Sequence, residues 1–324
     1  MKLHRRAVLA ALSFCIVAPA FAQTATQYPQ RAVKLILPFG PGTATDIAAR
    51  MIGEKLATKW GKPVVIENRA GGDGLIAIRA FLQAADDHTL LYSSSASFIA
   101  HPYTLQTKPP YDMEKDLLPI ARTTDTVLAV SVPTALPVKT LAEFVEYAKQ
   151  NPGKLNGAGA AGLPEFSIAA FIQARGLQVT KVPYRDVVQA GQDLSENRIQ
   201  ILASSYAVVL PHAQAGKVRI LSTGAAKRTS LAPDLPSPNE AGFPELAIET
   251  TVGFYGPAGM PRDLRIQISK DILGTLGDKE FVDRLTATGQ VVNGQGPDEL
   301  AAALKEQAAA AKRLADILGI KPKE

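Results

Sequence analysis

Short apolar runs alternate along this chain with segments of helical periodicity, and this alternation constrains the fold more than any other feature. The runs at 33–37, 64–66 and 90–92 have the length and composition of buried strands. Between them, apolar residues at helical spacing predict helices over 47–56 and 75–84. The same patterns predict further strands at 127–132, 179–182, 199–203 and 218–222, and further helices at 141–148 and 297–318. Strands that alternate with helices are typical of an α/β fold with parallel sheets.

The length of the chain indicates more than one hydrophobic core. At 324 residues it exceeds what a single core usually serves, so we expect two lobes. A hydrophobic content of 46% and a charged content of 20% are those of a globular protein, because disordered chains are far less apolar.

The first 22 residues have the pattern of an export signal. Basic residues at positions 2, 5 and 6 precede an apolar run over 7–17, and small residues flank Phe21 as a signal peptidase requires. We therefore expect cleavage after Ala22 and export to the periplasm, with a buried first helix as the alternative. The run is shorter than the roughly 20 apolar residues that span a membrane.

Removing this segment changes both the charge and the cysteine content. The whole chain has 35 basic and 30 acidic residues; the segment carries three basic residues and no acidic one, which leaves 32 against 30. A body so close to neutral lacks the clustered cations that bind nucleic acid or membrane surfaces, so we expect neither partner. Cys15 is the single cysteine and lies in the segment, so we expect no disulfide in the mature chain.

Three successive predicted strands end in unusual loops. They are the segment 38–46 with its glycines and prolines, the glycine-rich segment 67–74, and the serine run 93–95. Ligands of open α/β sheets bind at the carboxyl ends of strands, where helix starts present free N–H groups. Glycine allows the backbone to approach a ligand closely, and Thr45 or Asp46 is suited to cap the next helix. Neither glycine loop matches a nucleotide-binding fingerprint.

At these and other positions the sequence resembles the Bug proteins, which are periplasmic solute receptors of tripartite tricarboxylate transporters. The opening of the resemblance is Tyr28-Pro29, the strand 33–37 with Pro38-Phe39, then Pro41-Gly42 and Thr45-Asp46. It continues in order through 63–69, 110–112, 152–156, 182–185, 215–219, 234–236, 240–242 and 256–259. The match therefore covers essentially the whole mature chain.

The resemblance implies a two-lobed receptor of the type II periplasmic-binding class, a Venus flytrap in which each lobe is a mostly parallel sheet flanked by helices. It implies a first lobe of residues 23–126 and 251–324, and a second of 127–250. A small carboxylate-bearing solute is expected in the cleft, held by the loops 38–46 and 68–74, largely through backbone amides. We expect a monomer without cofactor, which closes about two chain crossings and delivers solute to the membrane subunits of such a transporter.

The predicted ligand-binding residues lie at strand ends of both lobes. They are Phe39, Gly42, Thr43, Ala44, Thr45, Asp46, Gly71, Gly72, Asp73, Ser94, Ser95, Glu165, Phe166, Tyr184 and Ser204. The second lobe departs most from the family pattern. Glu165 and Phe166 stand where the family often has small hydroxyls, and Ser204 stands in a strand that often carries acids. We therefore expect the contacts with the far end of the solute to depart from the family pattern more than the contacts with the bound carboxylate. For Phe39, in the first lobe, core packing is an alternative role.

Glu165 bears on which solutes fit. Two like charges about 4 Å apart at an effective dielectric of ~20 repel by on the order of 4 kcal/mol. An unpaired Glu165 in the cleft would therefore oppose a second carboxylate, and we expect the solute not to be a symmetric di- or tricarboxylate. Three arrangements remain open: Glu165 faces solvent in the first helical turn, pairs with an arginine, or meets an amine or hydroxyl of the solute.

The sequence does not favour an enzyme. Beyond the export signal the histidines are His88, His101 and His212, scattered without a motif for catalysis or metal binding, so we predict no catalytic or metal-ligating residue. The run Asp86-Asp87-His88 is interpreted as a surface turn. Two alternatives to the transport receptor stay open, namely a ligand-binding adaptor for a membrane sensor and a periplasmic hydrolase.

Overall fold

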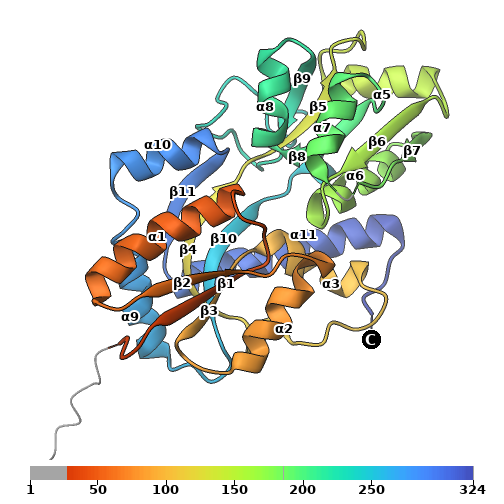
Figure 1. Cartoon of the computed structure of the whole chain (residues 1–324). Helices are drawn as coiled ribbons and strands as arrows, with labels where there is room; N and C mark the ends of the chain where they lie inside the picture. The colour runs from red at the N-terminus through yellow and green to blue at the C-terminus, as the bar shows by residue number, and fades with distance from the viewer. Residues whose placement is uncertain (1–27, 185, 324) are drawn as a thin grey trace, which may run out of the picture.

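The computed structural model of the chain describes residues 28–184 and 186–323, in two α/β lobes (Figure 1). The predicted export signal over residues 1–22 and its cleavage after Ala22 lie outside the described residues. Among the helices described, none has the length and apolar character needed to cross a membrane.

The first lobe is built on a six-stranded sheet in the order β11-β4-β10-β3-β1-β2. Its strands are β1 (Val33–Leu37), β2 (Val64–Asn68), β3 (Thr89–Ser94), β4 (Leu118–Thr126), β10 (Thr250–Gly256) and β11 (Gln290–Gln295). The first four run in one direction, and β10 and β11 run in the other. The sheet is therefore mixed, with a parallel part that carries the sequence-predicted strands.

Helices cover both faces of this sheet. Apolar residues of α1 (Ala44–Trp60), α9 (Arg262–Leu273) and α10 (Lys279–Ala287) pack with one face. The other face packs against α2 (Leu75–Ala84), α3 (Ser95–Thr104) and α11 (Pro297–Leu318), with the short α4 (Met113–Asp116) beside them. A 3-10 turn, η1 (Gly72–Gly74), precedes α2.

The second lobe is a five-stranded sheet in the order β7-β6-β8-β5-β9. Its strands are β5 (Leu128–Pro133), β6 (Leu155–Gly159), β7 (Val179–Lys181), β8 (Ile201–Ser205) and β9 (Val218–Thr223). All run in one direction except β5. The helices α5 (Leu141–Gln150) and α6 (Leu163–Ala174), with η2 (Pro244–Leu246), pack on one face, and α7 (Val187–Ser195) and α8 (Tyr206–Gln214) on the other.

Within the described residues the chain passes between the two sheets twice. The first crossing is at Val127, since β4 ends one residue before it and β5 begins one residue after. The second lies just before β10: the Ile248 N–H still donates to Gly224 O in the second lobe (2.7 Å), whereas Thr250 Oγ1 donates to Thr126 O in the first (3.1 Å). The two crossings lie side by side, because Thr250 pairs with Thr126 at the start of β10 and the end of β4, as a hinge requires.

A third connection between the lobes is noncovalent. The end of α11 packs on α6, where Leu314 and Ala315 contact Phe166 and Ala170 (Figure 1). Gln173 Nε2 also donates to Ile317 O across this contact, at 2.7 Å. Through α11 the first lobe therefore supports α6 of the second lobe.

Candidate solute-binding site

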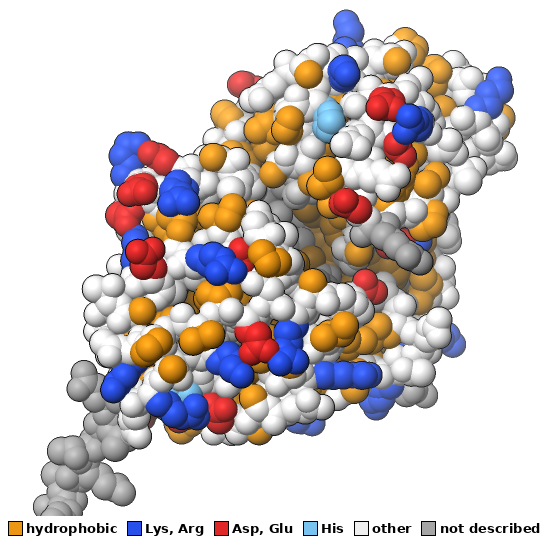
Figure 2. All heavy atoms as spheres, in the orientation of Figure 1, with side chains coloured by type: hydrophobic (Ala, Val, Ile, Leu, Met, Phe, Trp, Pro, Cys, Tyr) orange, Lys and Arg blue, Asp and Glu red, His pale blue; other side chains and the backbone are white. Residues whose placement is uncertain are grey.

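The loops predicted to bind solute lie at the edges where the two sheets face each other. β4 runs parallel in direction to β1, β2 and β3 and leads straight into the second lobe, so the carboxyl ends of all four strands face that lobe. By the same logic β5 enters at the edge of its sheet where β6, β7 and β8 end. Figure 2 shows the surface hollowed between the lobes at this level.

The first loop, residues 38–46, is held in shape by hydrogen bonds from its own side chains. Thr43 is the N-cap of α1: its Oγ1 accepts from the Asp46 N–H (3.3 Å) and donates to Gly40 O (3.0 Å). Gly42 has φ +82°, the left-handed region that favours glycine. Thr43 and Gly42 are exposed, and Ala44 and Phe39 are half-buried. The start of α1 is thus open to a ligand.

Asp46 anchors this loop and does not point its carboxylate into open space. The side chain is 2% exposed and accepts from Gly42 N (2.9 Å), from Asn68 Nδ2 (2.8 Å) and twice from Arg50 (2.9 Å each). Burial alone would raise the pKa of Asp46, but the hydrogen bonds from Arg50, Asn68 and Gly42 outweigh it and hold the pKa below its ordinary value.

Arg50 and Asn68 complete this group, and neither was among the candidate residues, although Asn68 begins the predicted loop 68–74. Asn68 Nδ2 also donates to Phe39 O at 3.0 Å, and its Oδ1 accepts from Arg50 at 3.1 Å. Asn68 ends β2, so this group of three polar side chains ties the first loop to the second. The i, i+4 spacing of Asp46 and Arg50 on a predicted helix was the available signal.

The second loop holds the most unusual backbone of the molecule. Gly71, Gly72, Asp73 and Gly74 have φ of +113°, +56°, +53° and +91°. Asp73 is the member with a side chain, and a non-glycine residue in this region costs about 1–2 kcal/mol. The first three are exposed, so the turn presents its backbone to solvent at the start of α2.

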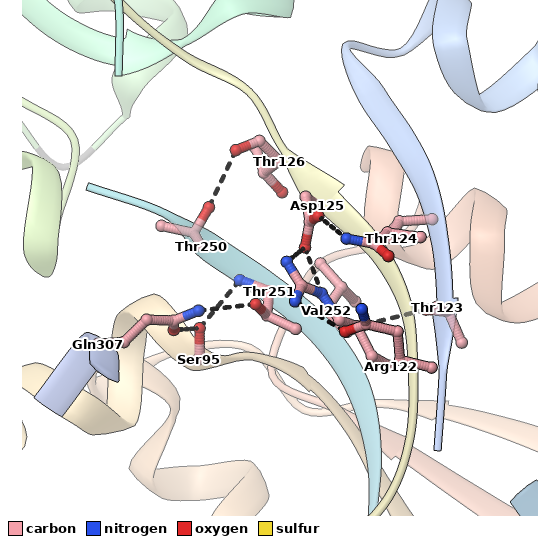
Figure 3. Close-up of polar contacts among 12 residues, drawn as sticks. Ser95, Arg122, Thr123, Thr124, Asp125, Thr126, Thr250, Thr251, Val252 and Gln307 are labelled. Atoms are coloured by element: carbon pink, nitrogen blue, oxygen red, sulfur yellow. Dashed lines mark hydrogen bonds and ion pairs between the residues drawn. The ribbon is translucent and has the colours of Figure 1, made fainter. Parts of the chain in front are cut away.

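At the third strand end the structure separates two predicted serines. Ser94 is the N-cap of α3, and its Oγ accepts from Ala96 N at 3.3 Å. Ser95 is fully buried: its Oγ donates to Gln307 Oε1 (2.5 Å) and accepts from Thr251 N (3.0 Å). Gln307 closes the group by donating to Thr251 Oγ1 at 2.7 Å (Figure 3). Ser95 thus joins α3, β10 and α11 beside the hinge, and its contact with a solute stays a prediction.

In the second lobe, Glu165 forms an ion pair with Lys181, with the two side chains 34% and 55% exposed. The cation is a lysine at the end of β7, not the arginine considered from the sequence. Gly159, at the end of β6, allows the first turn of α6 to pack against it, because a Cβ at this position would lie 2.4 Å from Glu165 Cα. Phe166 is 7% exposed and packs against Tyr103 and the end of α11. Its ring therefore serves lobe-to-lobe packing, and a solute contact remains a prediction.

The remaining second-lobe candidates are also engaged within their own lobe. Tyr184 Oη donates to Asp193 Oδ2 at 2.7 Å, and burial together with that carboxylate raises the pKa of Tyr184 to about 12. Ser204 is fully buried, and its Oγ donates to Ser205 O at 3.3 Å. Thr45, in the first lobe, is buried as well. The structure thus bonds Gly42, Thr43 and Asp46 into one group with Asn68, holds Ser95 in a separate group, and leaves the second-lobe candidates dispersed.

A second polar group lies on the other side of the hinge strands (Figure 3). Arg122, 8% exposed, pairs with Asp125 (2.6 Å) and donates to Gln295 Oε1 (3.0 Å). Asn293 Nδ2 donates to Asp125 Oδ2 at 2.6 Å. None of these residues was a sequence candidate, because Asn293 and Gln295 reach Asp125 and Arg122 only after β4 and β11 pair.

One group of the described residues has the composition of a metal site. The ligand atoms of Asp86, Asp87 and His88 lie within 4.8 Å of one another. They are already used: Asp86 accepts from Arg31 and from the His88 N–H, and His88 Nε2 accepts from the Gln30 N–H. The group is a hydrogen-bonded turn before β3, as interpreted from the sequence.

Two α/β lobes, joined by paired crossings and facing each other with strand ends and helix starts, define the type II class of periplasmic binding proteins. Residues 48–320 match the family described as tripartite tricarboxylate transporter family receptor. Protein BugT of Bordetella pertussis is 30% identical over 287 residues, covering 88% of this chain and 87% of BugT. The chain belongs to this receptor family, as the sequence resemblance indicated.

Two solved structures support the same assignment. R. palustris Rpa4515 with adipate has a TM-score of 0.78 and 27% identity, over 91% of this chain and 99% of that one. MatC from Rhodopseudomonas palustris, with bound malate, has a TM-score of 0.75 and 27% identity, over 89% and 99%.

Proposed function

We propose that the protein is an exported receptor that captures a small carboxylate-bearing solute in its cleft and delivers it to the membrane subunits of a tripartite tricarboxylate-type transporter. In this proposal it acts in the periplasm as a monomer, without cofactor, after cleavage behind Ala22. Family membership and the two relatives solved with adipate and malate support a carboxylate as ligand.

The observation that carries the proposal is the bonded group of Asp46, Asn68 and Arg50. It ties the start of α1 to the end of β2, from which the loop to α2 departs, and helix starts present N–H groups and a positive dipole end to an anion. Because Asp46 is fully engaged and its charge is balanced by Arg50, a solute carboxylate meets backbone amides and not a free acid. We assign Thr43, Ala44, Gly71 and Gly72 to this grip, whereas Gly42, whose N–H is bonded to Asp46, shapes the loop.

Closure of the lobes over the solute completes the mechanism. A cavity of about 370 Å³ lies at the hinge, lined by Thr126 and Asn293 of the first lobe and by Ala225, Thr229 and Ser230 of the second. The cavity lies beside β11, the edge strand of the first sheet, and beside the end of β9, the edge strand of the second. The hinge strands therefore lie between this cavity and the predicted loops. Rotation that closes the cleft should therefore widen this cavity. Solute contacts from both lobes favour the closed state.

The experiment is a thermal-shift screen followed by calorimetry with adipate, malate, citrate, hexanoate and amino acids. Ligands that bind only the folded state raise the melting temperature, so a carboxylate is expected to raise it with one site per chain. Stabilisation by none of the carboxylates would remove the proposal. Conversion of the solute to product would favour the hydrolase instead, and capture by a sensor ectodomain without transport loss on deletion would favour the adaptor.

A further inference from the structure

The turn at residues 71–74 cannot hold its shape by local preference. Four consecutive residues with positive φ are rare, and Asp73 carries a side chain in a region that side chains disfavour. Within the turn, the Gly74 N–H donates to Gly71 O at 3.1 Å. A strained segment of this kind persists when its surroundings determine it.

The support comes from a buried pair behind the turn. His101 of α3 is 1% exposed, and its Nε2 lies 2.9 Å from the backbone oxygen of Asp73. Its Nδ1 lies 2.6 Å from the hydroxyl oxygen of Tyr111. The Asp73 carbonyl is thus connected through one imidazole to a tyrosine in the segment before α4.

The chemistry of these contacts determines where the protons are. A carbonyl oxygen can only accept, so Nε2 of His101 carries a proton and donates it to Asp73 O. In the neutral ring Nδ1 is then an acceptor, and Tyr111 donates its hydroxyl proton to it. Burial lowers the pKa of His101 and raises the pKa of Tyr111, and both shifts favour these neutral forms.

We propose that His101 and Tyr111 are positioning residues for solute binding, which hold the 71–74 turn in the shape that receives the carboxylate by bonding the Asp73 carbonyl. The proposal rests on the proposed function for what the turn binds, and on geometry alone for what holds it. Neither residue needs to touch the solute, because the chain Tyr111–His101–Asp73 acts on backbone atoms from behind.

The test compares variants that remove the donor with one that replaces it. His101→Leu loses the donor to Asp73, whereas His101→Gln can still donate from its side-chain amide. We expect His101→Leu to weaken adipate or malate binding, measured by calorimetry, about tenfold, and His101→Gln to recover most of it. Tyr111→Phe removes one oxygen and should weaken binding about threefold, since His101 keeps its bond to Asp73 but loses its fixed orientation.

Tyr28→Phe is the matched control. The Tyr28 hydroxyl also donates to a backbone carbonyl, that of Asp87, and it lies outside the loops of the site. Its removal should leave affinity unchanged. Rescue by glutamine separates positioning from general stability, because both His101 variants remove the same buried ring.

A second measurement needs no solute. Amide NMR signals of Gly71, Gly72 and Gly74 in the free protein should shift and exchange faster in His101→Leu and Tyr111→Phe than in Tyr28→Phe. If wild type binds adipate or malate and His101→Leu binds them equally well, or if the turn signals do not change in either variant, the positioning role is wrong. If wild type binds no carboxylate while the turn signals do change, the proposed function fails and the positioning role stands. Should His101→Leu not fold, Tyr111→Phe decides.

Discussion

The two halves of the cleft are built on different principles. In the first lobe the charged side chains, Asp46 and Arg50, bond to each other and leave backbone amides at the helix starts. In the second lobe the corresponding strand ends carry Glu165 and Tyr184, whose polar ends reach partners in their own lobe. Backbone amides bind any carboxylate, whereas side chains, which differ from one sequence to another, distinguish solutes by the atoms beyond that carboxylate. Under the proposed function we therefore expect the first lobe to supply general affinity for a carboxylate and the second lobe to supply selectivity.

The largest effect is expected from Asp46→Ala. It leaves the Gly42 N–H without its acceptor and Asn68 Nδ2 with Phe39 O alone, and so weakens the connection between the two loops. Solute affinity should fall about 100-fold or more, and the free energy of unfolding should fall by about 2 kcal/mol. Calorimetry and urea unfolding measure the two. Asp298→Ala removes a carboxylate that is 73% exposed and paired with Arg262, and it should change neither. Unchanged affinity in Asp46→Ala would break the contrast between the lobes.

The same carboxylate predicts a pH dependence. The pKa of Asp46 is lower in the folded protein than in the unfolded chain, where it is about 3.9. Its contribution to stability is therefore fully present above about pH 4 and is lost as the pH falls through the folded pKa. Wild type should exceed Asp46→Asn in unfolding free energy at pH 7, and the gap should narrow below about pH 4. A gap that does not vary between pH 7 and pH 3 would contradict this.

Selectivity should respond to the ion pair of the second lobe. Glu165→Gln removes a negative charge and leaves Lys181 free, so adipate should gain about tenfold over hexanoate, which has the same number of carbons and one carboxylate. Lys181→Met should shift the ratio the other way. Calorimetry with the two acids in each variant measures it. If all three proteins give the same ratio, the pair does not face the far end of the solute. The expected exclusion of symmetric dicarboxylates rested on an unpaired Glu165, and the ion pair with Lys181 removes that premise.

A smaller effect should follow from filling the hinge cavity. Ser230 is exposed at the rim of this cavity. The large side chain in Ser230→Trp should hold the cavity open, which favours the closed cleft because the two lie on opposite sides of the hinge. Solute binding should therefore strengthen about threefold to tenfold. Gln178→Trp, on exposed second-lobe surface, is the control. Small-angle scattering of the variant without solute should show a smaller radius of gyration. Weaker binding would mean that the cavity narrows, and not widens, when the cleft closes.

Much of the fold was readable from local pattern. The strand at 33–37, the helix at 75–84 and the helix at 297–318 have the predicted bounds, because each is an unbroken apolar run or stripe. The strands β4, β6, β10 and β11 were missed. β4 carries Arg122 and three threonines and β10 begins with two threonines, polar residues whose partners come from neighbouring elements of the first lobe. β6 consists largely of glycine, alanine and asparagine, which carry no apolar signal.

The loops of the candidate site could be predicted from the sequence, but the roles of the residues in them could not. Glycines and helix caps mark the loops because backbone conformation is a local property. Whether Asp46 faces a solute or anchors a loop depends on Asn68, 22 residues away, and on a strand pairing that no local pattern reveals. Phe166 and Ser95 were chosen by position in a motif, and both are packed against α11, from the far end of the chain.

The sequence by itself determined the class of fold, the family and the positions of several strands, helices and glycine-rich loops, since these follow from periodicity, turn residues and ordered motifs. Tertiary structure alone decided which polar groups are used up inside the protein: Asp46 by Arg50 and Asn68, Glu165 by Lys181, Ser95 by Gln307, and the Asp73 carbonyl by His101. The physical reason is that a hydrogen bond or ion pair is satisfied by whichever partner folding brings within about 3 Å, and most of these partners lie far apart in the chain.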